Sequence, residues 1–409
     1  MTAGRARPSS EPGPDARRSP AIRVSGAGCC VMDLLYDVPE GQDRLAPWLS
    51  RVPGDGGLVR GGAVLKSDLE RRTAMSVDAW LAEVVGDVQP RRSLGGVGVV
   101  TLIAAAQLLP AGSSVEFHGC VSDDADGDWL LGQIARTPLG RARLCRRRGR
   151  PPTTVILNER HAGRAPDRSF VAEPCMPDSL ALEVADLDPD FFHNDVVAFS
   201  FMPWEPKLFA RLTSVVERCK RSGSLTVMGT AFDAARTADG RRWPLGDSDE
   251  VHRRLDVLVM DQTEALRYSG EPDQASALRF FQRSGVGAVV VTNGESPVRY
   301  WSGGSVCAPA EGEAPIPSAI VVDRDRGLLP TGDTVGCGDN FAGGVIASLA
   351  LQKAAGRRID LLEAVRLGSL SGALASTHAG GVFFEKAPGE KRALVARYCE
   401  AYEEELRRG

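Results

Sequence analysis

The stretch "PTGDTVGCGDNFAGGVIASLA" (residues 330–350) places several glycines and two aspartates, Asp333 and Asp339, before and into an apolar helical pattern. In open parallel sheets, ligands bind at the carboxyl ends of strands, where loops turn into helix N-termini. Glycines at 336 and 338 let the backbone turn tightly with exposed N–H groups, to which the helix dipole adds its positive end. The stretch therefore predicts an anion-binding turn and a helix that starts near Asp339.

The aspartate at the mouth of this turn limits the kinds of reaction that the turn could support. It would repel a permanently bound anion, unless its task is to remove a proton from a hydroxyl that then attacks phosphorus. In that interpretation the backbone amides of Gly336, Cys337 and Gly338 neutralise the transferring group, and Asp339 is the base. The alternative that stays open here is purely structural: Asp339 is an N-cap, and the glycines only form a turn.

Short Val-rich strands alternate with helical patterns along the chain around this stretch. Such alternation is typical of βαβ units and predicts a doubly wound α/β fold with a mostly parallel central sheet flanked by helices. Strands are predicted within 113–121, 153–160, 195–201, 225–232 and 286–294, and helices within 67–88, 95–109, 206–223 and 274–285.

The N-terminal part divides into three segments. Residues 1–20 are rich in Pro, Arg, Ser and Gly and lack the apolar run of a signal peptide, so we expect a disordered tail. Residues 21–39 read as a buried strand, a glycine turn, the acid Asp33 and a second extended piece. Residues 40–66 are Gly-rich and weakly patterned, which predicts an insertion outside the main layers.

Composition limits the classes of partner. The 409 residues are 43% hydrophobic and 25% charged with a net charge of −4, so no global positive field exists to hold nucleic acid or an anionic membrane. No run reaches the roughly 18 apolar residues of a membrane span. Nine scattered cysteines without C-x-x-C pairs predict reduced thiols in a cytoplasm, and five histidines without ligand spacing disfavour a histidine-based metal cluster. We expect a small-molecule substrate.

The sequence also carries a family resemblance. "DTVGCGD" followed by "NFAGG" resembles the C-terminal signature D-T-x-G-A-G-D of the ribokinase-like (PfkB) carbohydrate kinases. Four further segments resemble family motifs in the expected order: "GGVGVV" (95–100), "GCVSDDADG" (119–127), "DVLVMDQTEAL" (256–266) and "VVVTNGE" (289–295). The resemblance spans roughly residues 21–400.

The resemblance implies a ribokinase-like kinase domain over 21–409 with a small β lid from insertions around 36–66 and 150–172. It implies transfer of the γ-phosphate of ATP, with Mg²⁺, to a hydroxyl of a sugar or sugar-like polyol. By motif position, the residues assigned to the substrate are Asp33, Gly95 and Gly96; those assigned to the nucleotide are Asp261, Thr292, Gly294, Asp333 and Thr334; and Glu264 is assigned to Mg²⁺ through water. The family's loop at Asp333 and Thr334 can also bind a monovalent cation, which leaves K⁺ activation open.

Each assignment has a structural alternative. Asp33 fits a turn-stabilising acid after a strand, Gly95 and Gly96 fit a plain helix N-terminus, and Glu264 fits a helix-start acid favoured by the dipole. The run "RRRGR" (146–150) is interpreted as a solvated loop or edge strand rather than a phosphate site.

The chain also departs from the family pattern at several positions. Asp261 replaces the usual Asn, which adds negative charge near the phosphates and predicts tighter metal dependence. Val100 stands where many sugar kinases carry Asn, so one hydroxyl contact is expected to be missing, and Cys337 replaces the Ala of the anion hole.

Two other functions compete with a sugar kinase. The first is a nucleoside kinase of the same fold, in which aromatic side chains such as Tyr36 and Trp48 would stack on the base. The second is a non-catalytic sugar- or nucleotide-binding protein, which the intact "GCGD" argues against. Because lids of this family often pair between subunits, the resemblance also suggests a homodimer through the lid.

Overall fold

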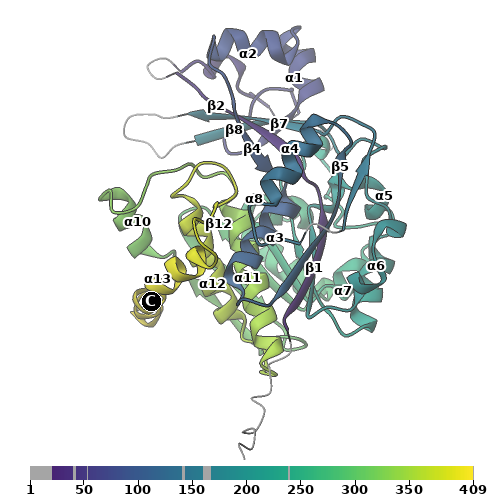
Figure 1. Cartoon of the computed structure of the whole chain (residues 1–409), viewed down its shortest axis with the longest axis vertical. Helices are drawn as coiled ribbons and strands as arrows, with labels where there is room; N and C mark the ends of the chain where they lie inside the picture. The colour runs from purple at the N-terminus through teal and green to yellow at the C-terminus, as the bar shows by residue number, and fades with distance from the viewer. Residues whose placement is uncertain are drawn as a thin grey trace, which may run out of the picture.

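The computed structural model describes residues 21–39, 43–52, 54–140, 143–159, 167–237 and 240–408. The predicted tail at 1–20 lies outside the described residues. Within them, the chain builds a large α/β layer structure with a smaller sheet at one end, at the top of Figure 1.

The main sheet is mostly parallel. Its strands, in the order β14-β13-β12-β11-β10-β9-β1-β5-β6, are parallel to their neighbours from β6 to β12, while β13 and β14 form an antiparallel edge. Val-rich strands such as β12, which is buried over Ala288–Val291, are typical of a sheet covered on both faces. The bounds are β1 Arg23–Gly28, β5 Ser114–Ser122, β6 Leu144–Arg147, β9 Val196–Ser200, β10 Leu225–Gly229, β11 Val257–Asp261, β12 Ala288–Asn293, β13 Ser296–Ser302 and β14 Ala310–Ala314.

Helices cover both faces of this sheet, which confirms the doubly wound α/β prediction. One face packs against α3 Val97–Leu108, α4 Ala125–Ile134, α10 Ser318–Asp325, α11 Cys337–Ala354, α12 Leu361–Ala375 and α13 Glu390–Arg408. The other packs against α5 Pro206–Phe209, α6 Leu212–Arg221, α7 Glu250–Arg254, α8 Gln262–Ser269 and α9 Gln274–Ser284.

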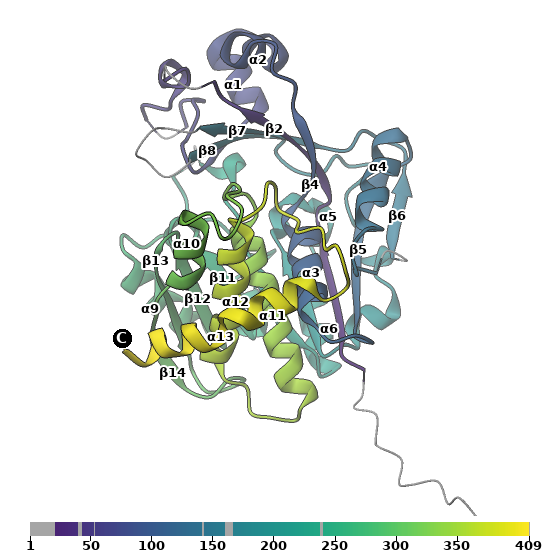
Figure 2. The same cartoon turned by 60° about the vertical axis from the view of Figure 1, so that its left-hand side comes forward.

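Two glycines explain the close helix packing around α11. A Cβ on Gly343 would lie 2.5 Å from the carbonyl oxygen of Thr101 in α3, and one on Gly344 would lie 2.6 Å from that of Leu367 in α12. The backbones of the three helices therefore approach more closely than larger residues allow. Figure 2 shows α3, α11 and α12 side by side in front of the sheet.

The second sheet has the order β3-β8-β7-β2-β4. Its outer face packs under two helices, with Val155, Leu157 and Val171 beneath Trp80 and Leu81. The bounds are β2 Val31–Asp37, β3 Ala63–Leu65, β4 Arg91–Gly95, β7 Thr153–Glu159, β8 Asp167–Ala172, α1 Lys66–Thr73 and α2 Val77–Val85. Only Cys29 and Cys30 separate β1 in the main sheet from β2 in the second sheet.

One sequence prediction differs from this fold and another agrees with it. The single helical pattern predicted over 67–88 is interrupted, because Ala74 takes a left-handed conformation and Ser76 caps a new helix through its side chain. The run at 146–150 begins on the edge strand β6, where Arg146 pairs with Asp123 and Asp128, so the edge-strand interpretation is confirmed. In the described part of the chain, no helix combines the length and apolarity needed to traverse a bilayer.

Candidate active site

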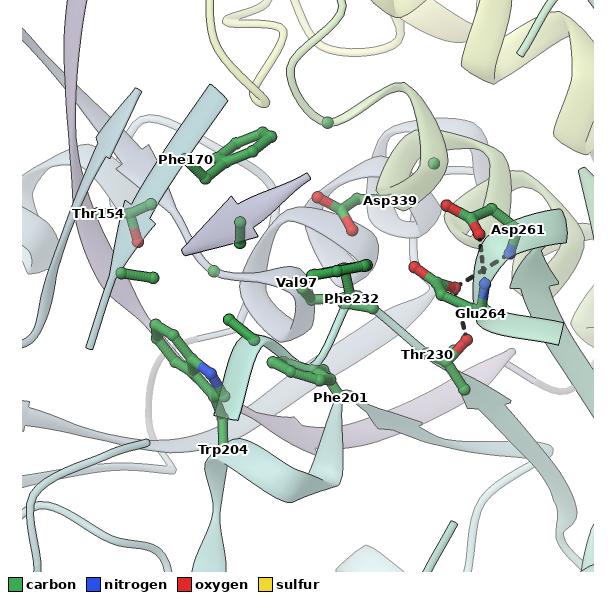
Figure 3. Close-up of a pocket in the computed structure, with 18 of the residues that line it drawn as sticks. Val97, Thr154, Phe170, Phe201, Trp204, Thr230, Phe232, Asp261, Glu264 and Asp339 are labelled. Atoms are coloured by element: carbon green, nitrogen blue, oxygen red, sulfur yellow. Dashed lines mark hydrogen bonds between the residues drawn. The ribbon is translucent and has the colours of Figure 1, made fainter. Parts of the chain in front are cut away.

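A cavity of about 280 Å³ lies between the carboxyl ends of the main-sheet strands and the inner face of the second sheet. Figure 3 shows side chains from both sides pointing into it. The sequence-predicted residues that line it are Asp33, Gly96, Asp261, Glu264, Thr292, Gly336, Gly338 and Asp339. The fold thus brings together residues that lie up to about 300 positions apart in the sequence.

The other predicted residues stand outside this lining. Gly95 and Cys337 lie next to lining residues, while the Asp333 carboxylate accepts hydrogen bonds from the backbone N–H groups of Val335 and Gly380. Thr334 accepts a hydrogen bond from an arginine of β8, and Gly294 sits in the turn after β12 with a φ of 55°.

The predicted anion-binding turn forms the N-terminus of α11. Gly336 is the N-cap with a φ of 73°, and a Cβ there would lie 2.5 Å from Gly381 Cα. Both the left-handed backbone and the lack of space for a side chain therefore favour glycine at this position. The helix begins at Cys337, and Asp339 is its third residue, so the N-cap interpretation of Asp339 is wrong. Within the described residues, the Gly338 N–H meets no backbone acceptor, and space around its Cα is open.

Asp339 presents an unengaged carboxylate to the cavity. No side-chain hydrogen bond to it occurs within the described part of the chain. Burial raises the pKa of Asp339 to about 7, while the positive charge of Arg168 acts to lower it. A carboxyl group with a pKa near neutrality is suited to accept a proton at physiological pH.

Arg168 is a residue that the sequence reasoning missed. It lies on β8, donates to the Thr334 hydroxyl, and its guanidinium carbon is 5.6 Å from the centroid of the Phe170 ring. Its charge lowers the pKa of Asp339 and acts in the same direction on Asp261 and Asp333. The signal was the alternation of "DRSFVA", in which Arg168, Phe170 and Ala172 share the cavity face.

Asp33 is the third residue of β2, opposite Ser93 of β4. Its carboxylate rests against Gly95, where a Cβ would lie 2.1 Å from Asp33 Oδ2. Burial raises its pKa well above the usual range, and the charges of Asp339 and Asp333 add to this. Gly96 adopts a φ of 105°, and a Cβ there would lie 2.5 Å from the carbonyl oxygen of Cys29.

Asp261 and Glu264 form a reciprocal capping box at the start of α8. The Glu264 N–H donates to Asp261 Oδ1 (2.7 Å), and the Asp261 N–H donates to Glu264 Oε2 (3.0 Å). Thr230, another residue that sequence reasoning missed, donates its hydroxyl to the same Glu264 oxygen at 2.7 Å. Its position after β10, at the carboxyl end of a parallel strand, was the available signal.

The charge of this pair suits a cation. Burial raises the pKa of Glu264 to about 8, with the Asp261 charge as the next cause, and burial also raises the pKa of Asp261. Two neighbouring carboxylates that line one cavity and repel each other's ionised forms are the donor set that Mg²⁺ prefers. The residues present therefore fit a divalent ion, and the capping box accounts for part of their arrangement as well.

Five aromatic residues of the described chain line the cavity: Phe341 of α11 and four that come from the strands and loops around it. Phe170 comes from β8, Phe201 and Trp204 from the segment after β9, and Phe232 from the loop after β10. Phe201 has a φ of 48°, a conformation that residues other than glycine rarely adopt and that tends to occur at functional sites.

The aromatic residues named from the sequence are elsewhere. Trp48 packs edge-on against Trp80 with ring centroids 6.3 Å apart, and Tyr36 packs in the same outer cluster of the second sheet. They fill the core between the second sheet and α1–α2, so the expectation that they stack on a substrate is wrong.

Comparisons with known proteins agree with the α/β fold described above. A model of the pfkB family of carbohydrate kinases matches residues 72–387. A comparison with curated proteins gave no match.

Several solved structures share the fold at low sequence identity. An adenosine kinase from Sinorhizobium meliloti has a TM-score of 0.66 and 17% identity, covering 93% of this chain and 99% of its own. A probable sugar kinase from Rhizobium etli has a TM-score of 0.66 and 17% identity over 92% and 99%. A ribokinase from Arabidopsis thaliana, solved with ribose and ATP, has a TM-score of 0.58 and 14% identity over 93% and 99%.

The family match covers most of the chain, and the ribokinase-like fold accompanies it. The chain therefore belongs to the pfkB family of carbohydrate kinases.

Proposed function

We propose that the chain is an ATP-dependent kinase that phosphorylates a hydroxyl of a nucleoside or of a similar sugar bearing a planar ring. Family membership supports a carbohydrate or nucleoside kinase, and the solved structures of this fold include both adenosine kinase and ribokinase. The observation that carries the finer proposal is the shared cavity, which the aromatic rings line together with Asp33 and Asp339.

The aromatic lining favours a planar substituent over a bare sugar. Aromatic faces stack on bases with little regard for hydrogen bonding, whereas a free sugar or polyol needs a polar partner for most of its hydroxyls. The polar side chains of the lining that come from the second sheet and its ends are Asp33, Thr154, Arg168 and Glu173. Arg168 lies over the Phe170 ring. Asp33 would accept hydrogen bonds from sugar hydroxyls, and Phe170 with Trp204 would enclose the planar ring.

The proposed transfer uses Asp339 and the turn before it. Asp339 accepts the proton of the attacking hydroxyl, whose oxygen bonds to the γ-phosphorus as the bond from that phosphorus to the β–γ bridging oxygen breaks. The electron pair of the broken bond leaves with ADP. The N–H groups of Gly336, Cys337 and Gly338 and the guanidinium of Arg168 would offset charge on the migrating group.

Asp261 and Glu264 would hold Mg²⁺, directly or through water. When bound, the ion neutralises charge on the nucleotide phosphates. The second sheet would act as the lid over the substrate, since Arg168, Phe170 and Thr154 on its inner face exclude water from the cavity.

A panel assay tests this proposal. Purified full-length chain is incubated with ATP and Mg²⁺ and with nucleosides, free pentoses, hexoses and polyols, and both ADP and the phosphorylated product are measured. We expect turnover with one or more nucleosides, at least tenfold above any free sugar, and a matching rise in Tm with the true substrate. Phe170→Ala should raise KM for that nucleoside more than it lowers kcat.

The outcomes separate the candidate functions. Preferential turnover of a free sugar or polyol would replace the nucleoside proposal with the sugar kinase expected from the family. Binding without turnover by any acceptor, seen as thermal shifts with nucleotide and ligand alone, would leave a non-catalytic binding protein.

A further inference from the structure

Lys391, in the first turn of α13, buries its ammonium group behind the anion-binding turn. The residue is 1% exposed, and Nζ donates to Asn340 Oδ1 at 2.5 Å. Burial of a lysine ammonium is costly, and lysines are almost never fully buried unless they are paired. The sequence placed no function on this residue.

Asn340 connects this ammonium to the turn. It follows Asp339 directly, and its Nδ2 donates both to the Gly336 carbonyl and to the Gly381 carbonyl, each at 2.8 Å. One side-chain amide thus joins the N-cap of α11 to the segment between α12 and α13, while its oxygen accepts from Lys391.

Several backbone contacts fix the same two segments against each other. The Gly332 N–H donates to the Ser376 carbonyl (3.0 Å), and the Asp333 N–H donates to the His378 carbonyl (3.1 Å). Figure 2 shows the segment between α12 and α13 arching above the start of α11. We refer to residues 332–336 and 376–381 as the loop crossing.

The family resemblance suggested a monovalent cation near Asp333 and Thr334. The oxygen atoms at this crossing already accept hydrogen bonds: the Gly336 and Gly381 carbonyls from Asn340, and the Asp333 carboxylate from two backbone N–H groups. The Lys391 ammonium is bound to the oxygen of the same Asn340 side chain whose nitrogen contacts both carbonyls, and a second cation at the crossing would meet its repulsion in a low-dielectric interior. The residues present do not fit an additional K⁺.

We propose that the Lys391 ammonium is the resident cation of the loop crossing, which positions the anion-binding turn through Asn340 and makes phosphoryl transfer independent of added monovalent cations. The inference rests on the proposed kinase function, and Lys391 acts as a positioning residue that does not touch the substrate.

The charges around Lys391 are consistent with this role. Burial lowers its pKa to about 7, while Glu385, whose carboxylate accepts the Lys391 backbone N–H at 2.9 Å, and the Cys337 thiol act to raise it. Its own charge in turn contributes to the lowered pKa of His378. A polyphosphate bound at the start of α11 would favour the charged ammonium in the same way as Glu385.

The first experiment measures cation dependence in the wild-type chain. Steady-state rates are compared in buffer with tetramethylammonium as the sole monovalent cation and after addition of K⁺, Na⁺ or NH₄⁺. We expect changes below about twofold. Activation by K⁺ of tenfold or more overturns the proposal.

The second experiment removes the Lys391 ammonium in two ways, by a substitution that keeps the volume of the side chain and by one that does not. Lys391→Met keeps the shape of the side chain but leaves the buried Asn340 Oδ1 without its donor, so we expect a lower Tm, and turnover is compared well below that Tm. Its kcat should fall at least tenfold with a smaller change in KM, and NH₄⁺ should not restore it. Lys391→Ala leaves a cavity, so NH₄⁺ or methylammonium should restore part of its kcat.

Two controls keep the outcomes distinct. Asp339→Asn should lose turnover irrespective of NH₄⁺, and a wild-type kcat in Lys391→Met overturns the role of Lys391 while leaving the kinase proposal intact. Hydrogen exchange provides a readout without activity: the amides of 332–340 should exchange faster in Lys391→Ala than in wild type and slow again with NH₄⁺. Unchanged exchange there contradicts the inference even if no acceptor is ever turned over.

Discussion

Asp339 is buried near a single guanidinium, and this balance predicts its pH behaviour. Because its pKa is raised to about 7, the carboxyl is protonated in mildly acidic solution and becomes a base only as the pH rises through that value. We expect kcat to increase with pH and to level off above about pH 8. Rates measured across this range with saturating substrates test the expectation.

The matched variant is Asp339→Asn, which keeps the shape of the side chain. Its kcat should be about 10²- to 10⁴-fold lower, and the remaining rate should lack the rise with pH. Near-wild-type turnover in this variant would contradict the role of Asp339 as base.

Gly95 offers a second prediction, because its missing side chain makes room for Asp33. A Cβ at Gly95 would overlap the Asp33 carboxylate, the mobile end of a side chain, so Gly95→Ala should displace Asp33 at a small cost in stability. We expect KM for the acceptor to rise about tenfold, which corresponds to roughly 1.4 kcal/mol. The control is Gly132→Ala, since a Cβ there meets nothing within 4 Å; an equal effect of both substitutions would refute the explanation.

The sequence predicted cavity-lining residues where they belong to a local motif. The turn at 336–339, Asp33 and the Asp261–Glu264 pair were found from glycine, acid and strand-end patterns and from the family resemblance. The aromatic residues were not, because Phe170, the Phe201–Trp204 pair and Phe232 stand in three separate segments. A lone aromatic residue in such a segment looks the same whether it fills a core or a cavity.

Strand β8 gives the prediction that belongs to a whole element. It brings Arg168 from the second sheet to the anion-binding turn, where its charge lowers the pKa of Asp339. Arg168→Gln should therefore shift the apparent pKa of the kcat profile upward and lower kcat at pH 7 by at least tenfold. Arg146→Gln on the half-exposed edge strand β6 is the control and should change neither value.

An unshifted pH profile together with an unchanged kcat in Arg168→Gln would show that this strand contributes shape and not charge. A lower kcat without a shift in the apparent pKa would mean that Arg168 acts on the charge of the transferring phosphoryl group and not on Asp339.

Periodicity predicted most elements of the main layers, because strands buried on both faces and amphipathic helices leave strong patterns. It failed at 67–88, where it gave one helical stretch. The break depends on the left-handed backbone of Ala74 and on the Ser76 cap, and an alanine in a helical pattern gives no signal of a break.

The covering of the second sheet bears on the assembly of the whole molecule. Trp80, Leu81 and Val84 of α2 bury the outer face of this sheet within one chain. In a homodimer that pairs through the lids, a second subunit would have to cover this outer face. Because α1 and α2 already cover it, we expect a monomer of 43.6 kDa in light scattering coupled to gel filtration. A stable dimer at micromolar concentration would mean that the subunits pair through another surface.

The sequence alone did not predict which residues far apart in the chain come together in space. The cavity joins Asp33 near the start of the chain to Asp339 near its end, and Lys391 reaches the turn from the last helix. A buried lysine cannot be told from an exposed one in a helix whose neighbours "EKRALVARYCEAYEEELRR" are mostly charged. Only the packing of α13 against the core separates the two cases.

The two-residue connection between β1 and β2 constrains how substrates enter. The chain also passes between the sheets at Gly96, between β6 and β7, and after β8, so a rotation of the small sheet would have to be absorbed at all four connections. The two shortest, Cys29–Cys30 and Gly96, lie next to each other, because a Cβ on Gly96 would lie 2.5 Å from the Cys29 carbonyl oxygen.

The hinge axis then passes within a few residues of Asp33. Because Asp33 lies close to this axis, opening would move it little and would instead carry Phe170 and Arg168 of β8 away from Asp339 and from the aromatic rings that the main-sheet loops contribute. Departure of the product would then begin with the separation of the two sides of the aromatic lining.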